Sequence, residues 1–265
     1  MDKLPSNAGW LWVKEGFALF RKQPAETSTL FLAYMFVMLA LGIVPVIGQI
    51  LPMLLVPMFS MSFMQACVHI EQGKRVYPNL LLTGLRSPVA GRLLFLGLLY
   101  LLAAIAAVAA SALVDGGDFW QVMSGQRDLE QQLGSDNSMT AAMLFSALVY
   151  IPAGMAFWYA APLIMWQRMS VGKALFFSFF AVLRARKAFL LYGVSWALIG
   201  VMTPALVSSI LSLLMPRSVV VIAVLLPLSL MMTVVMYCSF YPTYVHIFGR
   251  PEPATPAPLP QLPPG

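Results

Sequence analysis

The sequence predicts an all-α polytopic membrane protein with six transmembrane helices. Of its 265 residues, 60% are hydrophobic and 10% are charged, whereas a soluble domain has about 45–50% and about 25%. The mean hydropathy is +0.82, and the apolar residues form continuous runs of the length that a spanning helix needs. Alternating barrel-strand patterns are absent from these runs. This composition excludes a soluble enzyme, a disordered chain and a nucleic-acid-binding domain.

Six apolar runs are long enough to span a bilayer. We expect spans over about residues 28–45, 47–70, 92–114, 139–166, 188–215 and 218–248, in a single membrane domain of residues 1–249. Only the turn signal Pro45-Val46-Ile47-Gly48 separates the first two spans.

A separate helix is predicted over residues 8–22, before the first span. Trp10, Val13, Phe17 and Phe20 recur on one side of it at helical spacing, as in helices that lie in the headgroup plane. Pro24 then ends this helix.

The basic residues predict the orientation in the membrane. Of the 16 Lys and Arg residues, 14 fall on one side of the predicted topology, and Arg127 and Arg217 fall on the other. Cytoplasmic segments carry the excess of such residues, so we expect both termini in the cytoplasm. The acidic loop over residues 115–137 then lies outside. Residues 250–265 are rich in proline and predict a disordered cytoplasmic tail, with a ligand for a partner protein as the alternative.

Short similarities within the chain predict three repeats, each an interfacial amphipathic helix followed by a transmembrane hairpin. Residues 17–21 (FALFR) resemble residues 180–184 (FAVLR), and residues 82–86 (LTGLR) give a weaker third copy. Val68-His69-Ile70 and Val245-His246-Ile247 close the second and sixth spans alike. The apolar third copy is either a half-buried re-entrant helix or an early start of the fifth span.

Basic residues at the cytoplasmic ends of the spans are candidate contacts for anionic lipid headgroups. They are Arg21, Lys22, Lys74, Arg75, Arg86, Arg184, Arg186 and Lys187, which we call the basic collar. The expected partners are the lipid bilayer and another membrane protein, with no nucleic acid.

Chemistry-bearing motifs are missing from the sequence. No Asp, Glu, Lys or Arg occurs from Ser28 to Val68, or in the other spans beyond their cytoplasmic edges. Nucleophile-elbow, Walker and Rossmann patterns are absent. His69 and His246 lack a third metal ligand nearby in sequence. We therefore expect no catalytic residue, no cofactor and no metal site.

Prolines in the even-numbered spans favour a cavity between the helices. Kinks near Pro52, Pro152 and Pro227 would splay the hairpins around a central axis. The candidate lining residues are Tyr150, Trp158, Tyr159, Trp196, Thr203 and Tyr237. The alternative is that these prolines and aromatic residues serve only helix packing.

Several segments resemble an uncharacterised family of six-span inner-membrane proteins of Gram-negative bacteria. They are residues 9–21, the hairpin over residues 43–48, the Ala161-Pro162 pair and residues 244–248. The layout is more distantly similar to the membrane domain beside some glycerophosphodiester phosphodiesterases. The resemblance implies six helices in the inner membrane, and it implies no activity and no catalytic residue.

Three functions fit these observations in decreasing order. The first is a non-catalytic accessory, scaffold or envelope-organising protein, which suits uncharged spans. The second is a carrier or channel for a neutral or amphipathic solute or lipid. The third is a lipid-modifying enzyme that would use Asp115, Asp118 or the cytoplasmic Arg and His residues at a bilayer surface.

Overall fold

The computed structural model describes residues 4–5, 7–44, 47–125, 137–213, 219 and 221–251. All regular elements in these ranges are helical, and no β-strand occurs in them. Within the same ranges, six helices are long and apolar enough to cross a membrane. The predicted fold class, an all-α polytopic membrane protein with six spans, is confirmed.

The candidate spans start and end within a few residues of the predicted ones. They are Pro24–Gly42, Ile50–Glu71, Ala90–Asp115, Ser138–Trp166, Arg186–Leu211 and Val221–Phe248. The elements are α1 (Ala8–Lys22), α2 (Pro24–Gly42), α3 (Ile47–Glu71), η1 (Pro78–Leu82), α4 (Ala90–Asp115), α5 (Asp118–Met123), α7 (Asn137–Phe157), α8 (Ala160–Trp166), α9 (Val171–Arg184), α10 (Arg186–Leu211), η2 (Val221–Leu225) and α12 (Leu226–Phe248). Here η1 is a 3₁₀ helix and η2 is a π-helical turn.

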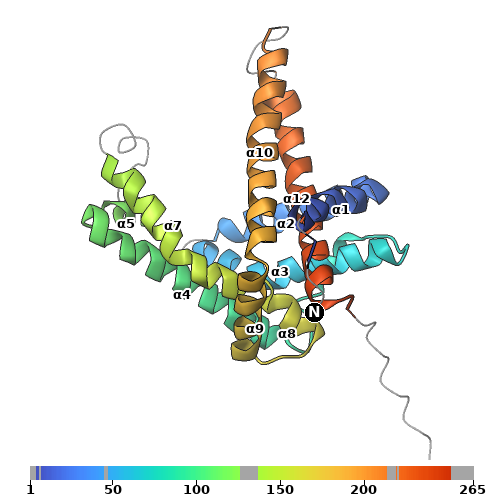
Figure 1. The fold of residues 1–265 in the computed structure, drawn as a ribbon, viewed down its shortest axis with the longest axis horizontal. Coiled ribbons are helices and arrows are strands. Elements are labelled where there is room, and N and C mark those ends of the chain that lie inside the picture. The colour runs from blue at the N-terminus through green and yellow to red at the C-terminus, as the bar shows by residue number, and fades with distance from the viewer. Residues whose placement is uncertain are drawn as a thin grey trace, which may run out of the picture.

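The helices form a packed base from which hairpins project in different directions. In Figure 1, α10 and α12 rise together as one arm, and α4 and α7 form another arm that points away from it. α1 lies across the base and packs against α10 and α12. α8 and α9 also lie at the base, beside the start of α10 (Figure 1).

A small separate cluster of Phe119, Met139 and Ala142 packs between α5 and α7, and the main hydrophobic core lies in this base. Its fully buried side chains include Met61 of α3, Leu163 of α8 and Tyr241 of α12. By contrast, no side chain from Trp196 to Leu211 of α10 is buried, and none from Val221 to Thr233 is buried. The outer halves of the α10–α12 arm are therefore left for lipid or another protein to cover.

The contact between α1 and α12 requires a glycine. A Cβ built on Gly16 would lie 2.8 Å from the Cα and 2.9 Å from the amide nitrogen of Ser239. No other residue type lets two helix backbones approach this closely. On the same face of α1, Trp12 and Val13 are fully buried, whereas Trp10 is 41% exposed. The buried face of α1 therefore packs on protein.

The predicted fourth span consists of two consecutive helices with a break between them. α7 ends at Phe157 and α8 begins at Ala160. Pro162 explains the break, because proline cannot donate to the carbonyl four residues earlier, at Trp158, and its ring crowds that carbonyl. The hydroxyl of Ser178 in α9 bonds both sides of the break: it donates to Met155 O at 2.9 Å and accepts from Tyr159 N at 2.9 Å.

The segment before the fifth span is a separate helix, α9, joined to α10 through Ala185 alone. α9 and α1 thus occupy matching places before a hairpin, whereas the corresponding place before α4 holds the short η1. The threefold repeat stays a prediction. The tail beyond Pro251 and residues 126–136 of the predicted outer loop lie outside the described residues.

Candidate functional site

A large open pocket lies where α9, the start of α10 and the end of α12 meet. Its volume is about 1180 Å³, above the range of about 300–1,000 Å³ that is typical of drug-sized ligands. Leu4 and Pro5 border it from the N-terminal side. The pocket lies at the boundary of the membrane-spanning region, because the fifth span begins and the sixth span ends beside it.

One wall of the pocket is apolar and comes from α9. Phe176, Phe177 and Phe180 recur on one side of this helix, and their exposed fractions are 59%, 43% and 39%. The opposite side of α9 is buried through Ala174 and Ser178. This amphipathic pattern turns the phenylalanines away from the core and toward the pocket.

The other wall is basic. Arg184, Arg186 and Lys187 line the pocket, and all three are exposed. They come together because α9 and α10 are joined by one residue, so the last turn of one helix meets the first turn of the next. The opposite terminal dipoles of the two helices offset each other at Ala185. The side-chain charges therefore set a positive potential, since none of the described residues that line the pocket is Asp or Glu.

His246 lies at the inner edge of this pocket and is held on both ring nitrogens. Its Nδ1 accepts a hydrogen bond from Trp12 Nε1 at 3.1 Å, and its Nε2 lies 3.1 Å from Glu15 Oε2. The tryptophan donor requires an unprotonated Nδ1, so the hydrogen of the neutral ring lies on Nε2 and points to Glu15. The ring thus joins α12 to α1.

A smaller pocket of about 160 Å³ lies on the other side of Glu15, between α1, α12 and the end of α3. Glu71 accepts a hydrogen bond from Tyr241 Oη at 2.8 Å and lies 3.5 Å from Arg250 Nε. Lys22 is at the rim. The polar groups of this smaller pocket mainly pair with one another or with Arg250, so the pocket is a structural junction.

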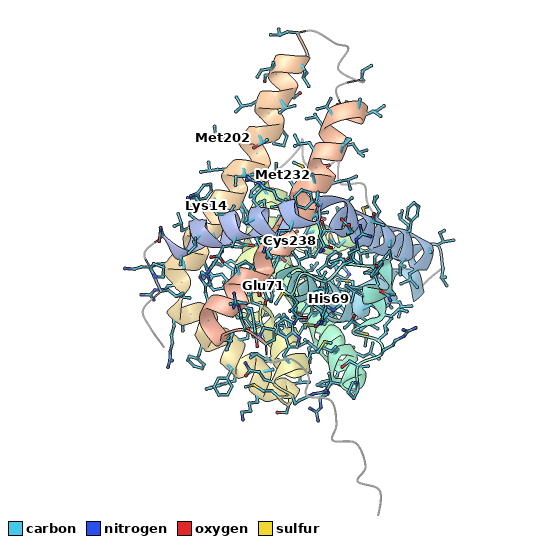
Figure 2. The ribbon with its side chains drawn as sticks, turned by 90° about the vertical axis from the view of Figure 1, so that its right-hand side faces the viewer. Lys14, His69, Glu71, Met202, Met232 and Cys238 are labelled. Atoms are coloured by element: carbon cyan, nitrogen blue, oxygen red, sulfur yellow. The ribbon has the colours of Figure 1, made fainter. Side chains whose placement is uncertain are left out.

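The residues of the basic collar are all exposed, and they divide between two regions. Arg184, Arg186 and Lys187 share the large pocket. Arg75 lies 3.9 Å from Glu26. The remaining members, Arg21, Lys22, Lys74 and Arg86, lie on α1 and around the α3–α4 connection. Figure 2 shows the base of the molecule, with His69 and Glu71, well apart from Met202 and Met232 on the arm.

The six residues expected to line an intramembrane cavity lie in several different packing environments. Tyr159 is 1% exposed. Trp158 contacts Phe189 edge-on at 5.2 Å between ring centroids. Tyr237 stacks on Phe63 at 4.5 Å.

The other three are equally dispersed. Trp196 stacks on Phe17 of α1 at 6.2 Å, Tyr150 contacts Phe157, and Thr203 lies in the uncovered half of α10. None of the six lines either pocket described above. The outward-facing cavity stays a prediction.

Sequence reasoning identified the three cations of the large pocket but not their phenylalanine wall or the role of His246. The signal for the wall was present, since Phe176, Phe177 and Phe180 fall on one side of a helix. The contact of His246 with Trp12 could not be predicted from the sequence, because the two residues are 234 positions apart in the chain. Among the described residues, no group of three or more His, Cys, Asp or Glu is placed to hold a metal ion.

The fold defines a helical, multi-pass membrane protein. No known family profile matches the chain, and no solved structure matches it. A probable inner membrane protein of Burkholderia thailandensis is 37% identical over 261 residues, covering 96% of each chain. The protein belongs to the same family as this relative and is a multi-pass inner-membrane protein. The predicted resemblance to uncharacterised inner-membrane proteins is thereby confirmed.

Proposed function

We propose that the protein is a non-catalytic accessory protein that binds another membrane protein through its α10–α12 arm. The observation that carries this proposal is an uncovered stripe of small residues on α10. Gly193, Ala197 and Gly200 are all exposed, and spacings of four and three residues place them on one face of the helix. Small residues at this spacing are the usual contact surface between helices in a bilayer.

The other glycines of the fold show why this stripe points to a partner. Gly16 and Gly97 are in use, since a Cβ on either would strike the backbone of a neighbouring helix. A Cβ on Gly193 or Gly200 would meet no atom within 4 Å. Glycine inside a helix costs about 0.5–1 kcal/mol relative to alanine. That cost is offset when a second helix approaches the bare backbone.

The uncharged spans support a role without catalysis. An enzyme at membrane depth needs a general acid or base, and the sequence offers no Asp, Glu, Lys or Arg in the interior of the six spans. An accessory role is favoured over the alternative of a carrier or channel, because the large pocket lies at one end of the spans. We place both termini in the cytoplasm, since the basic collar then follows the positive-inside rule. Reporter fusions at residues 125 and 265 test this placement.

Two alanines of α10 provide a matched test of the accessory role. Ala197 lies on the small stripe and Ala205 lies about 120° away from Gly193 around the helix, and both are exposed. Three proteins would each be extracted from native membranes in mild detergent. They are the unaltered full chain, the Ala197→Leu variant and the Ala205→Leu variant. Native mass spectrometry would then measure what remains bound.

The expected result is a second polypeptide at fixed stoichiometry with the unaltered chain and with Ala205→Leu. Ala197→Leu should lose it, because the leucine side chain holds the two helices apart. A second copy of this same chain would replace the accessory role with self-association. A bare monomer in all three samples, or equal loss in both variants, would overturn the proposal.

A further inference from the structure

The large pocket has the chemistry of a site for one amphipathic anion. Three cations form one wall, three phenylalanines form the other, and among the described lining residues none is acidic. Outside the lining residues, Lys173 Nζ lies 5.9 Å from the ring centroid of Phe177. A small hydrophilic anion would leave the phenylalanine wall uncovered, and an apolar molecule would leave the cations without a partner.

The position of the pocket selects the source of such a molecule. Arg186 begins the fifth span and Phe248 ends the sixth, so the pocket opens at the depth where headgroups meet hydrocarbon. Its phenylalanines are exposed on a helix whose other side is packed into the core. A bilayer lipid reaches such a site directly from the membrane.

We propose that this pocket binds one anionic phospholipid, with its phosphate on Arg184, Arg186 and Lys187 and an acyl chain along Phe176, Phe177 and Phe180. Basic pockets beside transmembrane helices are known to bind the headgroups of anionic lipids. The site is independent of the partner-binding role, because the small stripe of α10 lies further along that helix. Its occupant would tie α9 to the end of α12 at the membrane surface.

The test compares two lipids and two triple variants. The purified full chain in detergent would be titrated with phosphatidylglycerol or phosphatidylcholine of the same acyl chains, and bound lipid counted by native mass spectrometry. The pocket variant is Arg184→Gln, Arg186→Gln and Lys187→Gln. The matched control, Lys74→Gln, Arg75→Gln and Arg86→Gln, removes the same charge from exposed members of the basic collar outside the pocket.

The chain should bind one phosphatidylglycerol in preference to phosphatidylcholine. At about 1 kcal/mol for each basic residue near an anionic lipid, the pocket variant should lose affinity for phosphatidylglycerol by on the order of 100-fold. The control should keep its preference. Equal loss in both triple variants would overturn the site, because the effect would then be the general charge of the collar.

Two further measurements keep the proposal open to contradiction. The double variant Phe176→Ser with Phe180→Ser changes two exposed residues. It should weaken the binding of both lipids alike, since it removes contacts with the acyl chain. Unchanged binding would contradict the role of the apolar wall. This variant also serves if the triple pocket variant fails to fold. Glycerol phosphate at millimolar concentration should not displace the lipid, and displacement would show a site for a free phosphate compound instead.

Discussion

Trp12 of α1 donates a hydrogen bond from Nε1 to Nδ1 of His246 in α12, over a distance of 3.1 Å. The first and last described helices of the chain are therefore joined directly. Trp12 is fully buried, and its ring also contacts Phe189 and Tyr192 of α10 edge-on. This one side chain holds α1 against both helices of the protruding arm.

His246→Leu should destabilise the base, because it leaves the buried Nε1 of Trp12 without an acceptor. An unsatisfied buried donor costs about 1–3 kcal/mol. His246→Asn keeps an acceptor, so its stability should fall between those of the unaltered protein and His246→Leu. The measurement is the midpoint temperature at which the detergent-solubilised protein loses its monodisperse peak on heating. His69→Leu is the control at the matching end of α3, and equal effects at both histidines would contradict the role of the Trp12 bond.

Gly16→Ala should weaken the packing of α1 on α12. The new Cβ would lie 2.8 Å from the Cα of Ser239, and backbone atoms cannot move aside as a side chain does. Overpacking of this kind costs about 1–3 kcal/mol. Gly172→Ala is the matched control, since its Cβ meets nothing within 4 Å and alanine favours helix. The same heating assay separates them, and a Gly16→Ala protein as stable as the control would refute the close approach.

Ser178→Ala should destabilise the break between α7 and α8. It removes the donor to Met155 O and the acceptor for Tyr159 N, and each buried group left unpaired costs about 1–3 kcal/mol. Hydrogen exchange measured by mass spectrometry should rise at residues 155–160. Ser212→Ala, which changes an exposed serine, should leave exchange there unchanged. Protection that survives in Ser178→Ala would mean that the serine does not hold the break.

The spans were predictable from the sequence because each is a local property of composition and length. Every backbone amide in hydrocarbon needs a hydrogen-bond partner, so a continuous apolar run that spans the bilayer must form a helix. Even Pro24 is informative locally, since proline suits the first position of a helix and α2 begins there. The break at residues 158–159 was less predictable, because Pro152 lies inside α7 without ending it.

The candidate site was predictable only in part. Arg184, Arg186 and Lys187 could be assigned to the end of a span from their position in the sequence, but the pocket needs the fold. It forms because the end of α12 and residues Leu4 and Pro5 meet the junction of α9 and α10. Residues separated by most of the chain carry no sequence sign that they will meet.

By itself, the sequence determined the class of the protein, the approximate course of its six spans and the gathering of basic residues at their ends. These follow from the cost of placing polar groups and charges in hydrocarbon, which each segment meets alone. The tertiary structure decided which faces are covered. It buried Trp12 and Gly16 against α12, left Gly193 and Gly200 bare, and joined cations and phenylalanines in one pocket. Which faces are covered depends on close packing between segments that are distant in the sequence. In a bilayer there is no hydrophobic driving force between helices, so the apolar pattern of the sequence does not determine this packing.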